Sequence, residues 1–363
     1  MPTIIPSVRA THSFAEQEGF ALECGGELRP VTLQYAVYGE LNAARDNVVL
    51  VCHALSGSAE VADWWPELFS DNDFFSIDPY CVICINILGS CYGSTGPQSI
   101  NPSTGRTYGP DFPLVTVGDI VRSQREVLDH LGIDRIQLVI GGSIGGMQAL
   151  QWAMDFPGRV DNCVSIAATP LGPMGLALNH MQRQVIRLDP KWKNGDYGDQ
   201  PPALGLALAR KIAMCSYKSA ELFSTRFGRN PNRNGENPWA EPNARFDVSG
   251  YLDHQGEKFV QRFDTNSYLC ITKTMDTFDP VRKYGSIHAY SRIKARVTLV
   301  GISSDWLFPA SEVQSLAGEL RSCGVDCIYR EIESSHGHDA FLAEPDKLAS
   351  ILATRLSPRL TPD

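Results

Sequence analysis

Residues 141–146, GGSIGG, place four glycines around one serine, between a buried-strand pattern and a helical pattern. A serine between a strand and a helix can occupy a sharp turn that exposes its hydroxyl at the carboxyl edge of a sheet. Such a turn brings strand and helix together, so side chains at Gly141 and Gly145 would collide. The following helix also points free N–H groups at the reacting centre. The pattern therefore predicts a nucleophile elbow that carries Ser143.

Strand and helix patterns alternate up to about residue 170 and again from residue 296. Several continuous apolar runs are typical of strands buried on both faces. Alternation with short connections predicts an α/β fold, with a mostly parallel central sheet flanked by helices. The expected strands cover 31–39 (antiparallel), 47–55, 81–89, 136–142, 160–168, 297–301 and 326–332, and the expected helices cover 116–133, 146–156, 311–323 and 346–356.

The pattern changes between residues 171 and 291, where helical periodicity continues without a strong buried strand. Helical patterns cover 175–188 and 201–223, and a polar stretch at 228–243 predicts a surface loop. We therefore expect one α/β core domain interrupted by a helical lid domain, with the core formed by residues 1–170 and 292–363 and the lid by residues 171–291.

Charge and hydropathy narrow the possible partners. The net charge of −9 argues against nucleic-acid or anionic-membrane binding, because a basic surface is missing. No apolar run approaches the roughly 18 residues of a membrane span. The first twenty residues contain no apolar core of a secretory signal, so we expect a cytoplasmic protein.

The ten cysteines include one C-x-x-C pair, Cys81 and Cys84, inside a predicted strand. Residues three apart on a strand point to opposite faces and would not chelate one ion. No second pair with zinc-ligand spacing follows. We therefore expect no metal site and reduced, mostly buried thiols.

A serine hydroxyl needs a base to remove its proton. Proteins with a G-x-S-x-G elbow order the catalytic groups as serine, acid and histidine along the chain. Asp305 directly follows one late predicted strand, and His336 and His338 follow the next. These loops and Ser143 lie at the carboxyl edge of the predicted sheet, where catalytic groups of parallel sheets collect. We therefore expect Asp305 to orient the histidine.

Between the two histidines we select His338 as the base. The segment GHDAF predicts a turn at Gly337 followed by a helix start, and His336 fits a polar loop residue better. An oxyanion hole needs two convergent N–H donors. The backbone of Ile144, directly after the nucleophile, should supply one, and Leu55 in the loop CHALSG should supply the other.

Longer motifs go beyond a generic elbow, and GSCYGSTGP at 89–97 is the most specific of them. The full set is CHALSG (52–57), INILGSCYGSTGPQSINPSTGRTYGPDFP (85–113), GGSIGGMQALQWA (141–153), QRQVIRLDP (182–190), GLALARKIAMCSYKS (205–219) and SSHGHDAFL (334–342). Over nearly its whole length the chain resembles the homoserine O-acyltransferases, chiefly the homoserine O-acetyltransferases of methionine biosynthesis. The resemblance implies an α/β-hydrolase fold with a helical lid.

The resemblance also implies a ping-pong reaction in which an acyl group moves from acyl-CoA to the serine and then to an amino-acid hydroxyl. Acetyl-CoA would be a co-substrate, with no bound cofactor, and L-homoserine the acceptor. Arg210 can bind an α-carboxylate through two hydrogen bonds, and Asp339 can pair with the α-ammonium or contact the acceptor hydroxyl. By resemblance the triad is Ser143, Asp305 and His338, and the residues that hold the amino acid are Arg210, Tyr217 and Asp339.

The sequence is also compatible with other substrates and other functions. Related family members use succinyl-CoA or accept L-serine. The same triad could hydrolyse an ester or thioester with water as acceptor, and a lid of residues 171–291 is long enough to shield an acyl-enzyme from water. A non-catalytic binding module is disfavoured because serine, aspartate and histidine are all present. The resemblance suggests a homodimer formed through the lid helices.

Overall fold

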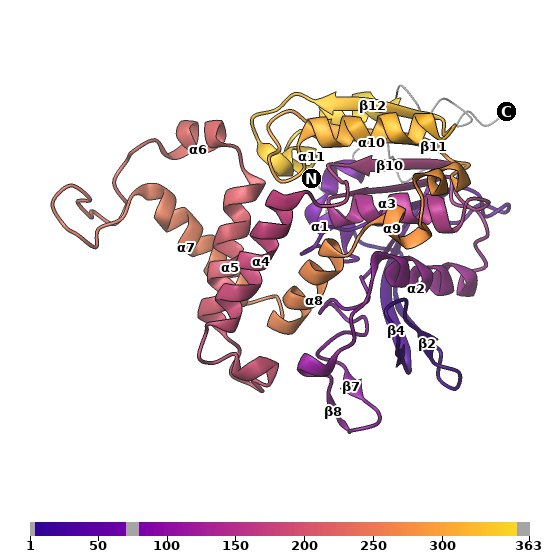
Figure 1. Cartoon of the computed structure of the whole chain (residues 1–363), viewed down its shortest axis with the longest axis horizontal. Coiled ribbons are helices and arrows are strands. Elements are labelled where there is room, and N and C mark those ends of the chain that lie inside the picture. Colours follow the sequence, from indigo (N-terminus) through magenta and orange to yellow (C-terminus); the bar gives the residue numbers. More distant parts are fainter. Residues whose placement is uncertain (1–3, 70–79, 354–363) are drawn as a thin grey trace.

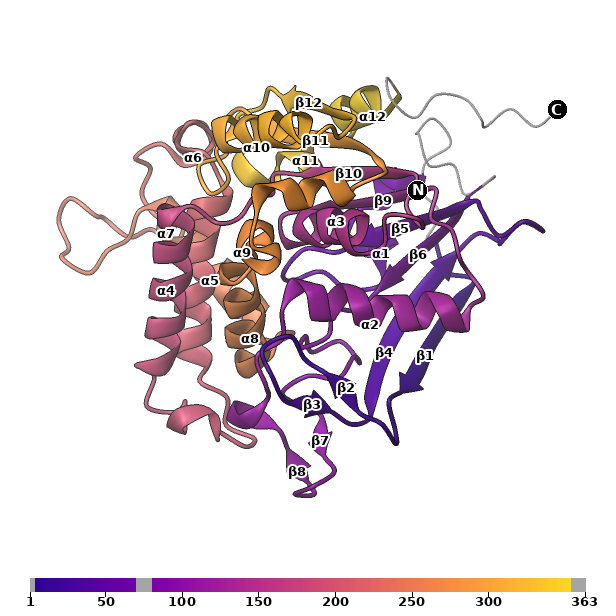
Figure 2. The ribbon, with the colours of Figure 1, turned by 45° about the vertical axis from the view of Figure 1, so that its right-hand side comes forward.

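The computed structural model describes residues 4–69 and 80–353. An eight-stranded sheet forms its centre, with strand order β1-β4-β6-β5-β9-β10-β11-β12 (Figures 1 and 2). Only β4 runs antiparallel to its neighbours β1 and β6, and all the other pairs are parallel. The strands are β1 (Val8–Phe14), β4 (Val31–Tyr38), β5 (Val48–Cys52), β6 (Cys81–Ile85), β9 (Leu138–Gly142), β10 (Asn162–Ile166), β11 (Arg296–Ile302) and β12 (Cys327–Ile332).

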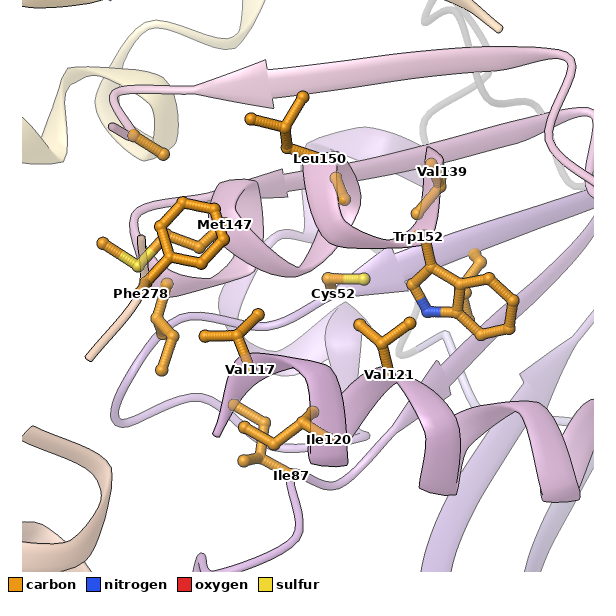
Figure 3. Close-up of a cluster of buried hydrophobic side chains, with 14 of the residues drawn as sticks. Cys52, Ile87, Val117, Ile120, Val121, Val139, Met147, Leu150, Trp152 and Phe278 are labelled. Carbon is orange, nitrogen blue, oxygen red and sulfur yellow. The ribbon is translucent and has the colours of Figure 1, made fainter. Parts of the chain in front are cut away.

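Helices cover both faces of this sheet, which confirms the predicted α/β-hydrolase architecture (Figure 2). Residues of α2, α3 and α10 share a core with one face, and residues of α1, α11 and α12 share a core with the other. Figure 3 shows part of the first core, where Val117, Val121 and Trp152 surround Cys52. The helices are α1 (Val61–Trp64), α2 (Val117–His130), α3 (Ile144–Asp155), α10 (Ala310–Ser322), α11 (Ala340–Ala343) and α12 (Pro345–Ala353).

The C-x-x-C pair lies on β6, as the sequence predicts. Cys81 packs in the core on one face of the sheet and Cys84 in the core on the other. Strand alternation therefore separates the two thiols, and burial raises the pKa of both, that of Cys81 to about 11.

Several predicted strands are shorter than expected at their carboxyl ends. The run predicted at 47–55 ends as a strand at Cys52, and the run at 81–89 ends at Ile85. The residues that follow leave the sheet to form turns, where His53 and Asn86 hydrogen-bond to other loop groups. Apolar composition alone does not distinguish these turns from strand.

The segment between β10 and β11, residues 171–291, is the predicted lid segment. No strand interrupts its helices, and it lies beside the carboxyl edge of the sheet (Figures 1 and 2). The pattern at 201–223 is not one helix as its continuity suggests, because Ser219 caps a second helix by accepting from the Leu222 N–H. The helices are α4 (Pro173–Arg187), α5 (Ala203–Tyr217), α6 (Ala220–Phe227), α7 (Asp247–Val260), α8 (Thr265–Asp276) and α9 (Pro280–Tyr284).

Shorter elements complete the described chain. None of the helices in residues 4–69 and 80–353 is long and apolar enough to cross a membrane. The helix expected at 346–356 is observed as α12 to Ala353, and its last three residues lie outside the described residues. The small strands are β2 (Phe20–Ala21), β3 (Glu27–Leu28), β7 (Ile100–Asn101) and β8 (Arg106–Thr107), and the 3₁₀ helices are η1 (Pro66–Phe69), η2 (Gly109–Asp111), η3 (Lys193–Gly195), η4 (Ile287–Arg292) and η5 (Gly337–Asp339).

Candidate active site

The glycine-rich segment forms a sharp turn between β9 and α3. Ser143 is the single residue between the two elements, with φ of 59° and ψ of −130°. A non-glycine residue at positive φ is strained, and such strain is held only where the surroundings determine it. The Ser143 N–H donates to the Ile166 carbonyl oxygen at 2.9 Å, which ties the turn to β10. Ser143 therefore has the backbone geometry of a nucleophile elbow.

Each of the four glycines around Ser143 lies too close to a neighbour for a side chain. A Cβ on Gly145 would lie 2.1 Å from the Cys52 carbonyl oxygen, and one on Gly141 would lie 2.5 Å from the Gly145 carbonyl carbon. Equivalent atoms on Gly142 and Gly146 would meet the Phe341 ring and the Ala168 Cβ at 2.6 and 2.7 Å. The structure therefore confirms that a side chain at Gly141 or Gly145 would collide with neighbouring backbone.

Asp305 and His338 meet at the same edge of the sheet. His338 Nδ1 lies 2.6 Å from Asp305 Oδ2, and both side chains are buried. The other oxygen, Asp305 Oδ1, accepts the backbone N–H groups of Leu307 and Phe308. His338 Nε2 is buried and has no hydrogen-bond partner among the described residues. The imidazole is therefore oriented at one nitrogen and free to exchange a proton at the other.

Phe341 connects this histidine to the elbow. Its ring lies against Gly142, beside Ser143, and 6.1 Å from the His338 ring centre. His336 takes a different position, half-buried in the loop with its N–H donating to the Ser334 hydroxyl. Of the two histidines in this loop, His338 is the one that contacts Asp305.

Opposing effects act on the pKa of His338. Burial lowers it, but the charge and hydrogen bond of Asp305, with the charge of Asp339, outweigh burial and raise it above its ordinary value. The folded protein thus holds this proton more tightly than the unfolded chain. The resulting stabilisation is present below the unfolded-state pKa and is lost as the pH rises through the folded-state pKa.

A tight turn at 54–57 carries Leu55, directly after the Cys52 and His53 carbonyls that lie against Gly145. The Gly57 N–H donates to the Ala54 carbonyl at 2.9 Å and closes this turn. The Leu55 N–H makes no hydrogen bond within the described residues, and the Ile144 N–H is one of the free donors at the start of α3. Both backbone groups chosen from the sequence are therefore available as donors.

His53 supports this turn from the core, a role that the sequence analysis missed. Its Nε2 accepts the Ile87 N–H at 3.1 Å, and its Nδ1 lies 2.8 Å from the Ala54 carbonyl oxygen. Burial lowers the pKa of His53 to about 4, so the ring is neutral at pH 7. One ring nitrogen thus donates while the other accepts. His53 joins the turn to the loop after β6.

The three residues assigned to amino-acid binding also gather near His338. The Tyr217 ring centre lies 5.7 Å from that of His338, and the Arg210 guanidinium lies over the Tyr217 ring at 5.5 Å. Arg210 Nε is buried and has no hydrogen-bond partner among the described residues. Asp339 directly follows His338, and its carboxylate is paired with Lys218 at 2.8 Å. The sequence analysis did not single out Lys218.

Arg262, at the end of α7, was also missed. Its Nη1 donates to the Ser56 carbonyl at 2.9 Å and contacts the Tyr92 hydroxyl at 2.6 Å. It therefore ties the lid segment to the turn that carries Leu55. Tyr92 belongs to the GSCYGSTGP segment, so this contact gives that motif a structural role.

Comparisons with known proteins agree with this geometry. The family model of the α/β hydrolase fold matches residues 47–345. A homoserine O-acetyltransferase of Symbiobacterium thermophilum is 45% identical over 359 residues, which cover 95% of this chain and 93% of that protein. The chain belongs to the homoserine O-acetyltransferase family.

Among solved structures, this chain is similar to both transferases and esterases. The crystal structure of the homoserine O-acetyltransferase of Bacillus anthracis matches with a TM-score of 0.89 and 27% identity, over 98% of this chain and all of that one. A crystal structure of an esterase matches with a TM-score of 0.84 and 26% identity, over 96% of this chain and all of that one. The fold is therefore shared by acyl transfer and ester hydrolysis.

The glycine contacts predict the effect of one added methyl group. Gly145→Ala should destabilise the fold by about 3 kcal/mol or more, because the new Cβ meets the backbone of β5 rather than a movable side chain. Gly318→Ala in α10 is the matched control, since among the described residues an added Cβ there would meet no atom beyond its own helix within 4 Å, and alanine favours a helix by up to about 1 kcal/mol. Urea unfolding measures the free energy of unfolding of both variants. Equal stability of Gly145→Ala and wild type would contradict the steric role of Gly145.

The histidine–aspartate pair predicts a pKa change. Asp305→Asn keeps the side-chain shape but removes its charge, so the pKa of His338 should fall by about one to three units. An NMR titration of the imidazole resonances measures this shift, with His336 as an internal control. An unchanged titration of His338 would mean that Asp305 does not act on it.

Proposed function

We propose that this family member transfers an acetyl group from acetyl-CoA to the hydroxyl of L-homoserine, giving O-acetyl-L-homoserine and CoA for methionine biosynthesis. The observation that carries the proposal is the Nε of Arg210, which is buried without a hydrogen-bond partner among the described residues and lies over the Tyr217 ring that adjoins His338. An ester hydrolase has no need of a guanidinium at this position, whereas an amino-acid acceptor brings a carboxylate that pairs with it. The name of the 45% identical relative supports this acceptor.

In the first half-reaction, His338 Nε2 takes the proton of Ser143 Oγ as this oxygen attacks the thioester carbonyl. The N–H groups of Ile144 and Leu55 stabilise the resulting oxyanion. The carbon–sulfur bond then breaks, and His338 returns the proton to the departing CoA sulfur. The product is acetyl-Ser143, and no bound cofactor or metal takes part.

In the second half-reaction, the acceptor hydroxyl gives its proton to His338 and attacks acetyl-Ser143. Collapse of the intermediate releases the ester and returns the proton to the serine oxygen. Arg210 holds the α-carboxylate, Tyr217 lines the site, and Asp339 holds the α-ammonium. The lid domain, residues 171–291 inserted into the core of residues 1–170 and 292–363, keeps water away until the acceptor binds.

We further propose a cytoplasmic homodimer that contacts through the lid helices. Exposed apolar side chains on and beside α4 and α5 support this surface, among them Leu188 and Leu204, which are 79% and 80% exposed. Sedimentation of the purified protein at twice its monomer mass would agree with the proposal, and sedimentation as a monomer would contradict it.

The substrate assignment is tested by measuring free CoA for a matrix of donors and acceptors. Acetyl-, propionyl- and succinyl-CoA are each combined with L-homoserine, L-serine or water. We expect acetyl-CoA with homoserine to have the highest kcat/KM. Preference for succinyl-CoA or serine would reassign the substrates within the family, and equal CoA release without any amino acid would identify a thioester hydrolase.

Arg210→Lys tests the acceptor site separately. An ammonium cannot reproduce the planar two-point contact of a guanidinium with a carboxylate. The variant should release one equivalent of CoA in a burst, followed by turnover that homoserine barely accelerates. Loss of such a charged contact costs about 2–5 kcal/mol in the second step. A weakened burst with normal homoserine dependence would place Arg210 at the CoA site instead.

A further inference from the structure

The end of α5 packs directly on the loop that carries His338. A Cβ on Gly337 would lie 2.8 Å from the Tyr217 carbonyl oxygen and 2.7 Å from the Ser219 nitrogen. The Ser219 hydroxyl donates to the Ser335 carbonyl of the same loop. Trp306, next to Asp305, donates its indole N–H to the Lys218 carbonyl at 3.3 Å. Backbone and neighbouring side chains therefore fix segment 217–219 without help from the Lys218 side chain.

The Lys218 ammonium has a separate partner across this junction. It lies 2.8 Å from the Asp339 carboxylate, and the two side chains are 15% and 27% exposed. Partial burial makes such a pair stronger than one on the open surface. Since other contacts already fix segment 217–219, the main contribution of the Lys218 ammonium is its positive charge. This charge lies next to the Asp339 carboxylate, one residue after the buried His338.

Two carboxylates act on the His338 imidazole. Asp305 bonds to it from the loop after β11, and Asp339 adds a second negative charge from the next position in η5. The end of α5 adds the Lys218 charge and the Tyr217 ring, whose centre lies 5.7 Å from that of His338, and in the proposed reaction the Ser143 hydroxyl faces the remaining nitrogen. Lys218 is the cation that opposes the two carboxylates there.

We propose that Lys218 is a positioning residue that holds the Asp339 carboxylate at the junction between lid and histidine loop and balances its charge beside His338. Without this cation, two uncompensated carboxylates would keep the imidazole protonated at higher pH, and a protonated imidazole cannot accept a proton from Ser143. The inference rests on His338 as the base of the proposed function, but not on the identity of donor or acceptor.

Lys218→Met and Lys218→Gln remove the charge, and Lys218→Arg keeps it. We expect the pKa of His338, measured by NMR titration, to rise by roughly one pH unit in the first two variants and to return toward wild type in the third. The matched control is Lys211→Met, which removes another lysine of α5 from an ion pair, here with Asp253 of α7 at 2.6 Å.

A rate measurement with p-nitrophenyl acetate provides the second readout. This activated ester reports acylation of the serine without CoA or an amino acid. The acidic limb of its pH–rate profile should move to higher pH in Lys218→Met and Lys218→Gln, while the rate on the alkaline plateau stays within about twofold.

An unchanged His338 titration in a folded Lys218→Met or Lys218→Gln variant would overturn the proposal, as would an equal shift in Lys211→Met. A plateau rate that falls without movement of the limb would also overturn it, because that result indicates a purely structural role. Failure of the proposed function would appear separately, as the wrong preference in the matrix of donors and acceptors. The NMR titration of His338 would still report on Lys218 in that case.

Discussion

The contact between α3 and the end of β5 has no room for a side chain, because a Cβ on Gly145 would lie 2.1 Å from the Cys52 carbonyl oxygen. Beside it, Ser143 has a strained positive φ, which persists only where the surrounding structure determines it. The same end of β5 continues into the turn at 54–57, and Gln148 of α3 donates to the His53 carbonyl at 3.3 Å. These contacts between α3 and the end of β5 hold Ser143 and Ile144 against the turn that carries Leu55.

The lid segment supplies parts of the site as well as a cover. Arg210 lies over the Tyr217 ring beside His338, Lys218 pairs with Asp339, and Arg262 bonds to the turn that carries Leu55. Its docking on Gly337 leaves no room for a side chain at that position. The lid and the catalytic loops are thus packed as one unit, so a change on α5 can alter the chemistry at His338.

Residues close together in the sequence allowed the strongest predictions. The elbow could be predicted because its glycines and serine lie within six residues between a strand and a helix pattern. Asp305 and His338 could be selected because they follow two late parallel strands, in the chain order of serine, aspartate and histidine. The α/β architecture followed from continuous apolar runs. The break after α5 was missed because the apolar pattern continues across the cap at Ser219.

Long-range contacts could not be predicted in this way. Strand β1 was missed because its exposed edge lacks an apolar run. His53, Lys218 and Arg262 act through partners 34, 121 and 206 residues away, and no local pattern of residues connects such positions. The roles proposed for Arg210 and Tyr217 came from the family resemblance alone, because arginine and tyrosine on an amphipathic helix are usually surface residues.

In the proposed reaction the acetyl group passes through Ser143. This route is tested most directly by mixing the protein with acetyl-CoA in the absence of an acceptor, quenching within milliseconds to seconds, and mapping the label by mass spectrometry. We expect one acetyl group on the peptide that contains Ser143, its absence in Ser143→Ala, and its transfer to homoserine when the acceptor is added. An acetyl group on Cys52 or Cys91, or product formation without any labelled enzyme, would contradict it.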